Sequence, residues 1–208
     1  MLMAITKPGD TIAVESPVYF GTLRFARSLG LNVLELPTDP DTGVDPDDVK
    51  RALTRHDIKA CFFVTNFSNP TGYCMPDAQK EALVKLLSQH GIPLIEDDLY
   101  GDVYFGKTRP RPCKSFDEEG NVLWCSSVSK TLAPGYRVGW VAPGKYLKKV
   151  KQLKLYHSIT TATAQQEAVA GFLATGRYEH HHHAATGSDL LGKVRETFAR
   201  AKALEGKR

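Results

Sequence analysis

Three polar segments carry the residue types best suited to chemistry. They run from Asn66 to Gly72 (NFSNPTG), from Asp97 to Tyr100 (DDLY), and from Ser126 to Lys130 (SSVSK), the last continuing to Arg137 (TLAPGYR). Together they hold carboxylates, hydroxyls, an arginine and a lysine amine, and such an amine can form an imine with a carbonyl compound. If the fold gathers them, these groups could bind a ligand and react with it.

Each segment has an ordinary explanation when it is taken alone. Asn-Pro-Thr-Gly is a common turn sequence, and Ser-x-Ser-Lys shares its outline with the Ser-x-x-Lys of unrelated hydrolases. An acidic residue after a strand is often a cap or part of a solvated loop. However, all three segments follow predicted strands, and ligands of open α/β sheets bind beyond the carboxyl ends of the strands. The joint occurrence in this order therefore predicts a single site.

The elements that must position these segments alternate along the chain. Short apolar strands and amphipathic helices follow one another, which is typical of an α/β domain with a mostly parallel sheet. Asp45 before Pro46 predicts a capped helix start, and Gly30 and Gly91 predict helix ends. We expect strands at 11–15, 32–36, 60–64, 93–97, 121–126 and 137–142, and helices at 19–29, 46–55, 76–91, 144–156, 163–174 and 189–204.

The three segments also resemble a known family. SNPTG, DDLY and SSVSKTLAPGYRVGW are similar to the large domain of the fold-type I, class I/II aminotransferases, which use pyridoxal 5'-phosphate (PLP). SKTLAPGYRVGW and EDDLYGDVYF most resemble the aminotransferase-like domain of MocR (GntR-type) regulators and the 2-aminoadipate-type transaminases, and PGDTIAVESPVYFG matches as well. The resemblance covers residues 4 to 178. It implies a three-layer α/β domain whose mostly parallel sheet contains one antiparallel strand.

The resemblance implies catalytic roles for three residues. Lys130 would hold PLP as a Schiff base and later carry the substrate's α-proton. Asp97 would face the pyridinium nitrogen and keep the ring protonated. Tyr100, together with the cofactor-binding Asn69, would hydrogen-bond the phenolic oxygen of the ring.

Four further residues would bind the cofactor by the same resemblance. Tyr19, in Pro-Val-Tyr, matches the aromatic residue that stacks on the ring face. Ser127 and Arg137 would bind the phosphate, since the planar guanidinium fork suits an oxyanion. Ser129 lies beside the lysine and could join them.

The implied activity is transfer of an amino group between an amino acid and a 2-oxo acid. An alternative is the PLP- and effector-binding domain of a MocR-type transcriptional regulator, because the same site residues fit both. Lyases and decarboxylases share the fold and most of these residues, since the cofactor supplies the electron sink and the protein selects the bond that breaks. A domain that has lost its cofactor is a further alternative, which the complete set of site residues disfavours.

The two ends of the chain depart from the family pattern. We find no match to the family's Gly-rich phosphate-binding turn or to its small C-terminal domain, so we expect a large domain that is incomplete at both ends. We assign residues 1–178 to this domain and residues 179–208 to a divergent helical tail. His180 to His183 in the tail favour a solvated joint over a metal site. A complete relative is expected to be a homodimer.

Composition limits the remaining possibilities. The chain has 208 residues, 42% of them hydrophobic, and no apolar run long enough to span a bilayer. Its N-terminus lacks the pattern of a signal peptide, and its four cysteines show no Cys-x-x-Cys spacing, which favours reduced thiols in the cytoplasm. The net charge of +4 is mild, and part of it lies at the spacing of a solvated helix face rather than a nucleic-acid site: Lys148, Lys149, Lys151 and Lys154.

Overall fold

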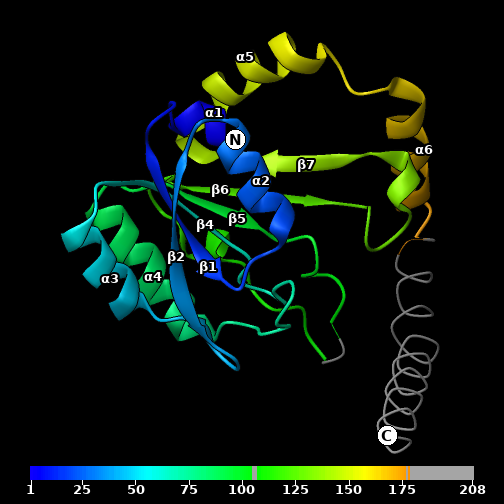
Figure 1. Ribbon diagram of the computed structural model, residues 1–208. Helices are drawn as coiled ribbons and strands as arrows, with labels where there is room; N and C mark the ends of the chain where they lie inside the picture. Colours follow the sequence, from blue (N-terminus) through cyan, green and yellow to red (C-terminus); the bar gives the residue numbers. More distant parts are fainter. Residues whose placement is uncertain (105–106, 177, 179–208) are drawn as a thin grey trace, which may run out of the picture.

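A seven-stranded sheet organises the part of the chain that the computed structural model describes, residues 1–104, 107–176 and 178 (Figure 1). The strand order is β3-β2-β1-β4-β5-β6-β7. The strands are β1 (Thr11–Ser16), β2 (Asn32–Asp39), β3 (Gly43–Val44), β4 (Ile58–Phe63), β5 (Leu94–Asp97), β6 (Val122–Ser127) and β7 (Gly139–Ala142).

Five adjacent strands, from β2 to β6, run parallel, so the predicted mostly parallel α/β sheet is confirmed. One antiparallel strand was expected, and β7 pairs with β6 in that way. The structure adds a second one, because β3 turns back along the end of β2. A strand of two residues is too short to show a periodic pattern, which explains why the sequence did not predict it.

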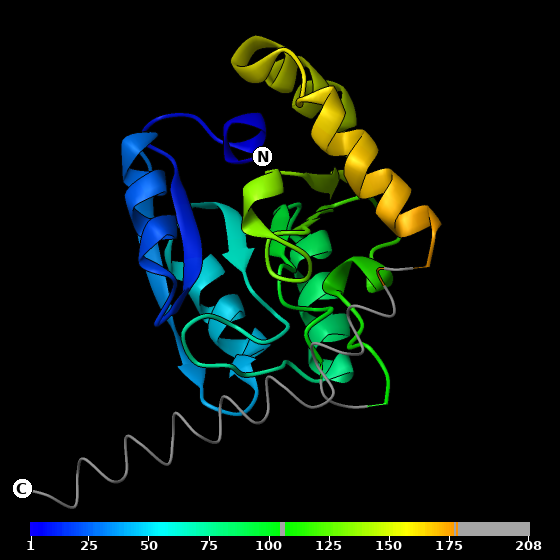
Figure 2. The same ribbon diagram turned by 90° about the vertical axis from the view of Figure 1, so that its right-hand side faces the viewer.

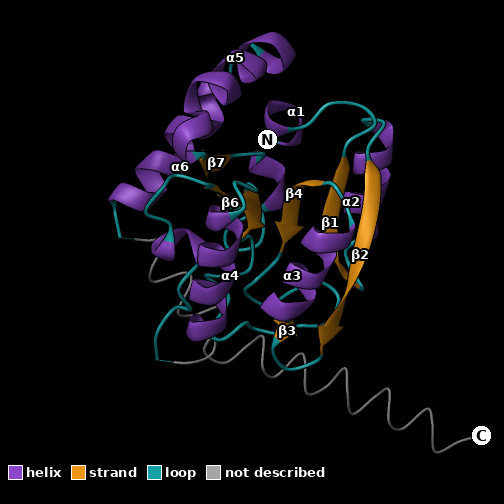
Figure 3. Cartoon of the chain, turned by 90° about the vertical axis from the view of Figure 1, so that its left-hand side faces the viewer, coloured by secondary structure: helices purple, strands orange, loops and turns teal. Residues whose placement is uncertain are grey.

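Helices cover both faces of the sheet and complete three layers. The longer helices are α2 (Phe20–Ser28), α3 (Pro46–Arg55), α4 (Asp77–Gln89), α5 (Leu147–Ser158) and α6 (Thr163–Ala174). Single turns form α1 (Leu2–Ile5) and the 3₁₀ helices η1 (Cys113–Phe116), η2 (Pro134–Tyr136) and η3 (Gly144–Tyr146). Figure 3 shows α3 and α4 together on one face, where they share a core with η1, while α1, α2 and α5 pack on the other.

Burial on both faces explains the apolar composition of the central strands. Ile12, Ala13 and Val14 of β1 are all fully buried, although successive side chains point to opposite faces. Parallel strands covered by helices on both sides read as continuous apolar runs for this reason. The polar residues that end these strands therefore stand out at the carboxyl edge of the sheet.

The order of the strands creates a switch point beside β1. The chain moves from β1 outward to β2 through α2, then returns through α3 to place β4 on the opposite side of β1. Two connections that leave in opposite directions open a crevice at the carboxyl ends of the strands, where α/β proteins bind ligands.

Local signals located most elements within a few residues. Asp45 caps α3 as predicted, since its Oδ1 accepts a hydrogen bond of 2.8 Å from Asp47 N. The last strand begins at Gly139 rather than Arg137, because Arg137 adopts a left-handed conformation with φ of 54° after η2. The first and last residues of an element depend on tertiary contacts, so local sequence signals predict them only to within one or two residues.

The C-terminal part of the described chain extends along one edge of the molecule. Figure 2 shows α5 and α6, yellow to orange, following one another there, and Val169 is the one buried residue among the two helices. No helix within the described residues is long and apolar enough to cross a membrane. The predicted helix at 189–204 and His180 to His183 lie outside the described residues, and the division at residue 178 stays a prediction.

Candidate active site

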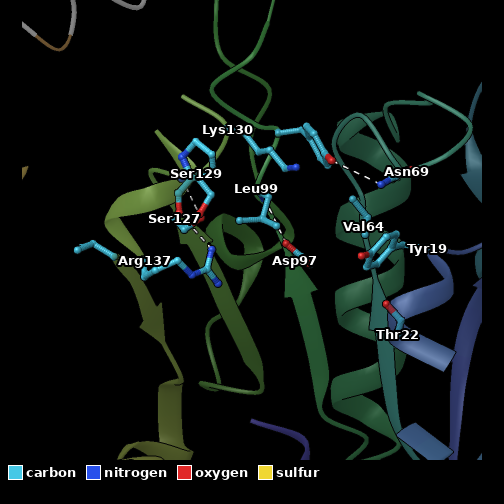
Figure 4. Close-up of a pocket in the computed structure, with 14 residues that line it drawn as sticks. Tyr19, Thr22, Val64, Asn69, Asp97, Leu99, Ser127, Ser129, Lys130 and Arg137 are labelled. Carbon is cyan, nitrogen blue, oxygen red and sulfur yellow. Dashed lines mark hydrogen bonds between the residues drawn. The ribbon is translucent and has the colours of Figure 1, made fainter. Parts of the chain in front are cut away.

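A cavity of about 500 Å³ opens at the carboxyl edge of β4, β5 and β6, beside the start of α2 (Figure 4). The eight residues predicted to form a site all line it, although they are spread over 119 positions from 19 to 137 of the sequence. They are Tyr19, Asn69, Asp97, Tyr100, Ser127, Ser129, Lys130 and Arg137. The cavity also has apolar and small walls that sequence reasoning did not predict: Thr22, Val64, Leu99, Pro134, Val138 and Gly139.

Asp97, the last residue of β5, provides the carboxylate in the middle of the cavity. Its pKa is raised to about 6, mainly by burial and to a smaller extent by the nearby charge of Asp98. The Leu99 backbone N–H, which donates to Asp97 Oδ1 at 3.3 Å, and the charge of Lys130 oppose this rise. A cationic group placed against Asp97 would favour the ionised carboxylate.

Asp98, the next residue, fixes this turn from the opposite side. Its side chain is 1% exposed, and its Oδ2 accepts hydrogen bonds from Arg109 Nη2 at 2.6 Å and Trp124 Nε1 at 2.8 Å. Asn66 Nδ2 donates to Oδ1 at 3.0 Å. The sequence indicated Asp98 only as part of DDLY, because its partners lie far along the chain. These bonds hold the turn that carries Asp97 and Tyr100.

Lys130 reaches into the cavity from the loop between β6 and β7. Its Nζ lies 5.6 Å from the centre of the Tyr100 ring. Across from it, Asn69 Nδ2 is 3.5 Å from Tyr100 Oη, so the amide and the phenol share one place in the wall. The loop is held by backbone hydrogen bonds, including Val128 N to Val138 O at 3.2 Å.

Hydroxyl and guanidinium groups gather on one side of the cavity. In Figure 4, Ser127, Ser129 and Arg137 lie on the opposite side from Tyr19 and Asn69. Ser127 Oγ accepts a hydrogen bond of 3.2 Å from Ser129 N, and the exposed Arg137 side chain makes a contact of 3.4 Å with Pro134 O. Two hydroxyls beside a guanidinium provide the donors that a phosphate group requires.

Tyr19 forms the other wall at the start of α2. Its side chain is 46% exposed, and its ring lies 4.7 Å from that of Phe20, centre to centre. An exposed aromatic face beside polar groups can stack on a planar ligand.

These groups fit PLP part by part. The amine of Lys130 suits the aldehyde, the carboxylate of Asp97 suits the ring nitrogen, and the Asn69–Tyr100 pair suits the phenolic oxygen. The donors grouped on one side suit the phosphate. The mostly parallel sheet and this donor set match the class of α/β proteins that bind PLP.

The chain belongs to the Aminotransferase class I and II family, whose sequence pattern it matches over residues 1–200. It is 46% identical over 180 residues to the HTH-type transcriptional regulator YjiR of Escherichia coli, an alignment that covers 86% of this chain and 38% of the regulator. It is 29% identical over 180 residues to aromatic-amino-acid aminotransferase 1 of Thermococcus litoralis, covering 84% of this chain and 43% of that enzyme.

A solved structure with the same fold is the kynurenine aminotransferase of Pyrococcus horikoshii in complex with PMP. It superposes with a TM-score of 0.83 at 26% identity, over 89% of this chain and 48% of the enzyme. The chain thus spans less than half the length of the relatives described here. Family and fold together imply PLP as the cofactor.

Proposed function

We propose that this chain forms the cofactor-binding part of a PLP-dependent aminotransferase, which transfers an amino group between an amino acid and a 2-oxo acid. The observation that carries the proposal is the meeting of Lys130, Asp97 and the Asn69–Tyr100 pair in one cavity at the switch point of the sheet. A lysine amine, a carboxylate and two hydrogen-bonding groups correspond to the reactive parts of PLP.

Bound PLP would supply an aldehyde for the amino group and an electron-withdrawing ring. Lys130 would hold the cofactor through Nζ and, once released, move the proton of the substrate's α-carbon. Asp97 would keep a proton on the ring nitrogen. Asn69 Nδ2 and Tyr100 Oη would donate hydrogen bonds to the phenolic oxygen.

The remaining residues of the cavity would bind and orient the cofactor. Ser127, Ser129 and Arg137 would hold the phosphate through hydroxyl and guanidinium donors. Tyr19 would cover one face of the ring and exclude water from it. Positioning of this kind makes the reaction effectively intramolecular.

A second candidate function is the effector-binding domain of a MocR-type transcriptional regulator. It is favoured by the identity of 46% to YjiR and of 42% to YdcR, both HTH-type transcriptional regulators of Escherichia coli. In such a domain the same residues would bind PLP and an amino compound, and the readout would be a change of conformation instead of a released product. Homodimerisation and a cytoplasmic location remain predictions for either function.

The two candidates differ in what an amino acid does to the loaded protein. The purified chain is titrated with PLP, reduced with borohydride and digested, and the modified peptide is identified by mass spectrometry. The variant Lys130→Ala is compared with Lys148→Ala, whose exposed lysine lies on α5 outside the cavity. We expect a visible absorbance band and a modification on Lys130 in wild type and Lys148→Ala, and neither in Lys130→Ala.

A panel of amino acids is then added to the loaded wild type. Release of a 2-oxo acid supports the aminotransferase, whereas a spectral change without any product favours the effector-binding domain. An absence of PLP binding by the wild type would contradict both.

A further inference from the structure

One buried carboxylate, that of Glu15, does not line the cavity and has none of the roles proposed above. Glu15, near the end of β1, has 0% exposed surface. Its Oε1 accepts a hydrogen bond of 2.9 Å from Ser68 Oγ, and its Oε2 accepts one from the Tyr73 hydroxyl. Val64 N donates a longer bond of 3.4 Å to Oε2. Both oxygens of Glu15 are thereby directed at the segment that follows β4.

This segment carries one of the cofactor ligands. Ser68 immediately precedes Asn69, and Val64 itself lines the cavity. The segment closes on itself, since Ser68 N donates to Tyr73 O at 3.0 Å and Gly72 N donates to Ser68 O at 2.6 Å. We call residues 65–75 the Asn69 loop. Two of its side chains, Ser68 and Tyr73, share Glu15 as their acceptor. The start of the loop is held separately, since Thr65 Oγ1 donates to Glu96 Oε1 at 2.6 Å and Asn66 Nδ2 donates to Asp98 Oδ1 at 3.0 Å.

Tyr73, one of the two loop residues bonded to Glu15, is itself held firmly by β3. Tyr73 is 3% exposed, and its ring packs against the backbone of Gly43 in β3 so closely that a Cβ at position 43 would collide with it. The ring therefore has little freedom to follow the loop. Moving the loop outward would break the bonds of Glu15 and leave buried hydroxyls without an acceptor, which is unfavourable.

Within the described residues, Glu15 has no cationic side chain as an ion-pair partner. A buried carboxylate that is not paired depends on hydrogen bonds for its stability. The three donors, Ser68 and Tyr73 of the loop and Val64 directly before it, are thus coupled to the position of this one side chain. Asp97 lies close enough for its charge to raise the pKa of Glu15.

We propose that Glu15 is a positioning residue, which holds the Asn69 loop through Ser68 and Tyr73 and thereby sets Asn69 against the phenolic oxygen of the cofactor. Glu15 does not touch the cofactor in this arrangement and acts through Asn69. The inference rests on the proposed PLP-binding function.

Two measurements test it, one of which needs no cofactor. Hydrogen exchange of the cofactor-free protein reports whether Glu15 holds the loop, because local opening exposes its amides. We compare Glu15→Gln and the milder Ser68→Ala with wild type. Leu31→Ala serves as control, since Leu31 is buried in the core on the opposite face of the sheet from Tyr73 and does not line the cavity, so its truncation is expected to lower global stability. Exchange of the Asn69 loop is expected to be about tenfold faster in the two test variants only.

PLP affinity then reports whether the loop positions Asn69. Glu15→Gln and Ser68→Ala should each weaken binding about tenfold, the effect of one lost hydrogen bond. In a double-mutant cycle, adding Glu15→Gln to Asn69→Ala should weaken binding little further, because both changes remove the same contact.

Each outcome decides the inference. Unchanged exchange in the test variants, or fast exchange with unchanged PLP affinity, would overturn it, as would additive effects in the cycle. If the wild type fails to bind PLP, the proposed function is refuted instead. The exchange rates then still show whether Glu15 holds the loop.

Discussion

Glu15 should make the stability of the fold depend on pH, and Glu15→Gln should remove that dependence. Burial raises the pKa of Glu15 from its ordinary 4.5 to about 7. The hydrogen bonds from Tyr73, Ser68 and Val64 N oppose the rise, whereas the charge of Asp97 adds to it. In the unfolded chain the carboxyl regains its ordinary pKa.

The direction in which stability changes with pH follows from the number of protons that the folded and unfolded states bind. Between pH 4.5 and about 7 the folded protein holds more of the Glu15 proton than the unfolded chain does. The free energy of unfolding therefore falls as pH rises through this window. With about 1.4 kcal/mol for each pH unit between the two pKa values, the loss amounts to roughly 3 kcal/mol. Glutamine cannot ionise, so the variant lacks this contribution.

Urea unfolding followed by circular dichroism measures the effect. The wild type should lose roughly 3 kcal/mol relative to Glu15→Gln between about pH 4 and about pH 8. Asp97, whose pKa is about 6, titrates in both proteins, so its contribution largely cancels in the difference. Tyr73, the other titratable group that faces Glu15, has a pKa raised above its ordinary value and stays neutral over this range. A difference that stays constant across the range would refute the reasoning.

Three further changes test other parts of the structure. Arg109→Met leaves the buried carboxylate of Asp98 without its ion pair and should lower the free energy of unfolding by about 3 kcal/mol, whereas Arg51→Met, at an exposed pair, should change it little in the same urea titration. Asp97→Asn should retain PLP but slow amino transfer at least about a hundredfold, measured as 2-oxo acid released, because a neutral amide cannot keep the ring nitrogen protonated. Arg137→Ala should weaken PLP binding at least about tenfold in an absorbance titration; unchanged affinity would remove it from the phosphate site.

Most of what could be predicted from the sequence depends on residues that lie close together in it. Strand and helix signals depend on periods of two and 3.6 residues, on caps such as Asp45 and on stops such as Gly91, all of which act within a few positions. The gathering of polar side chains from several strand ends was predictable for a related reason, since parallel strands bring their carboxyl ends to one edge. The eight cavity residues were found in this way and through the family resemblance.

Lys80 illustrates what local patterns miss. It lies on the face of α4 that also buries Leu83 and Leu87, and its side chain is 0% exposed although lysine is a residue type that is usually solvated. Its Nζ donates hydrogen bonds to Asn66 Oδ1 at 2.6 Å and to Arg111 O at 2.7 Å. Acceptors from two distant loops offset the removal of its charge from water, and no local rule could place them there.

The sequence by itself therefore determined the α/β class, the order of most elements and eight of the fourteen residues that line the cavity. Tertiary structure decided how those residues are held. Glu15 meets Ser68 and Tyr73 across 53 and 58 positions, and Asp98 meets Trp124 across 26. Such contacts depend on which strands become neighbours in the sheet, and a buried polar side chain shows its partners only after the chain has folded.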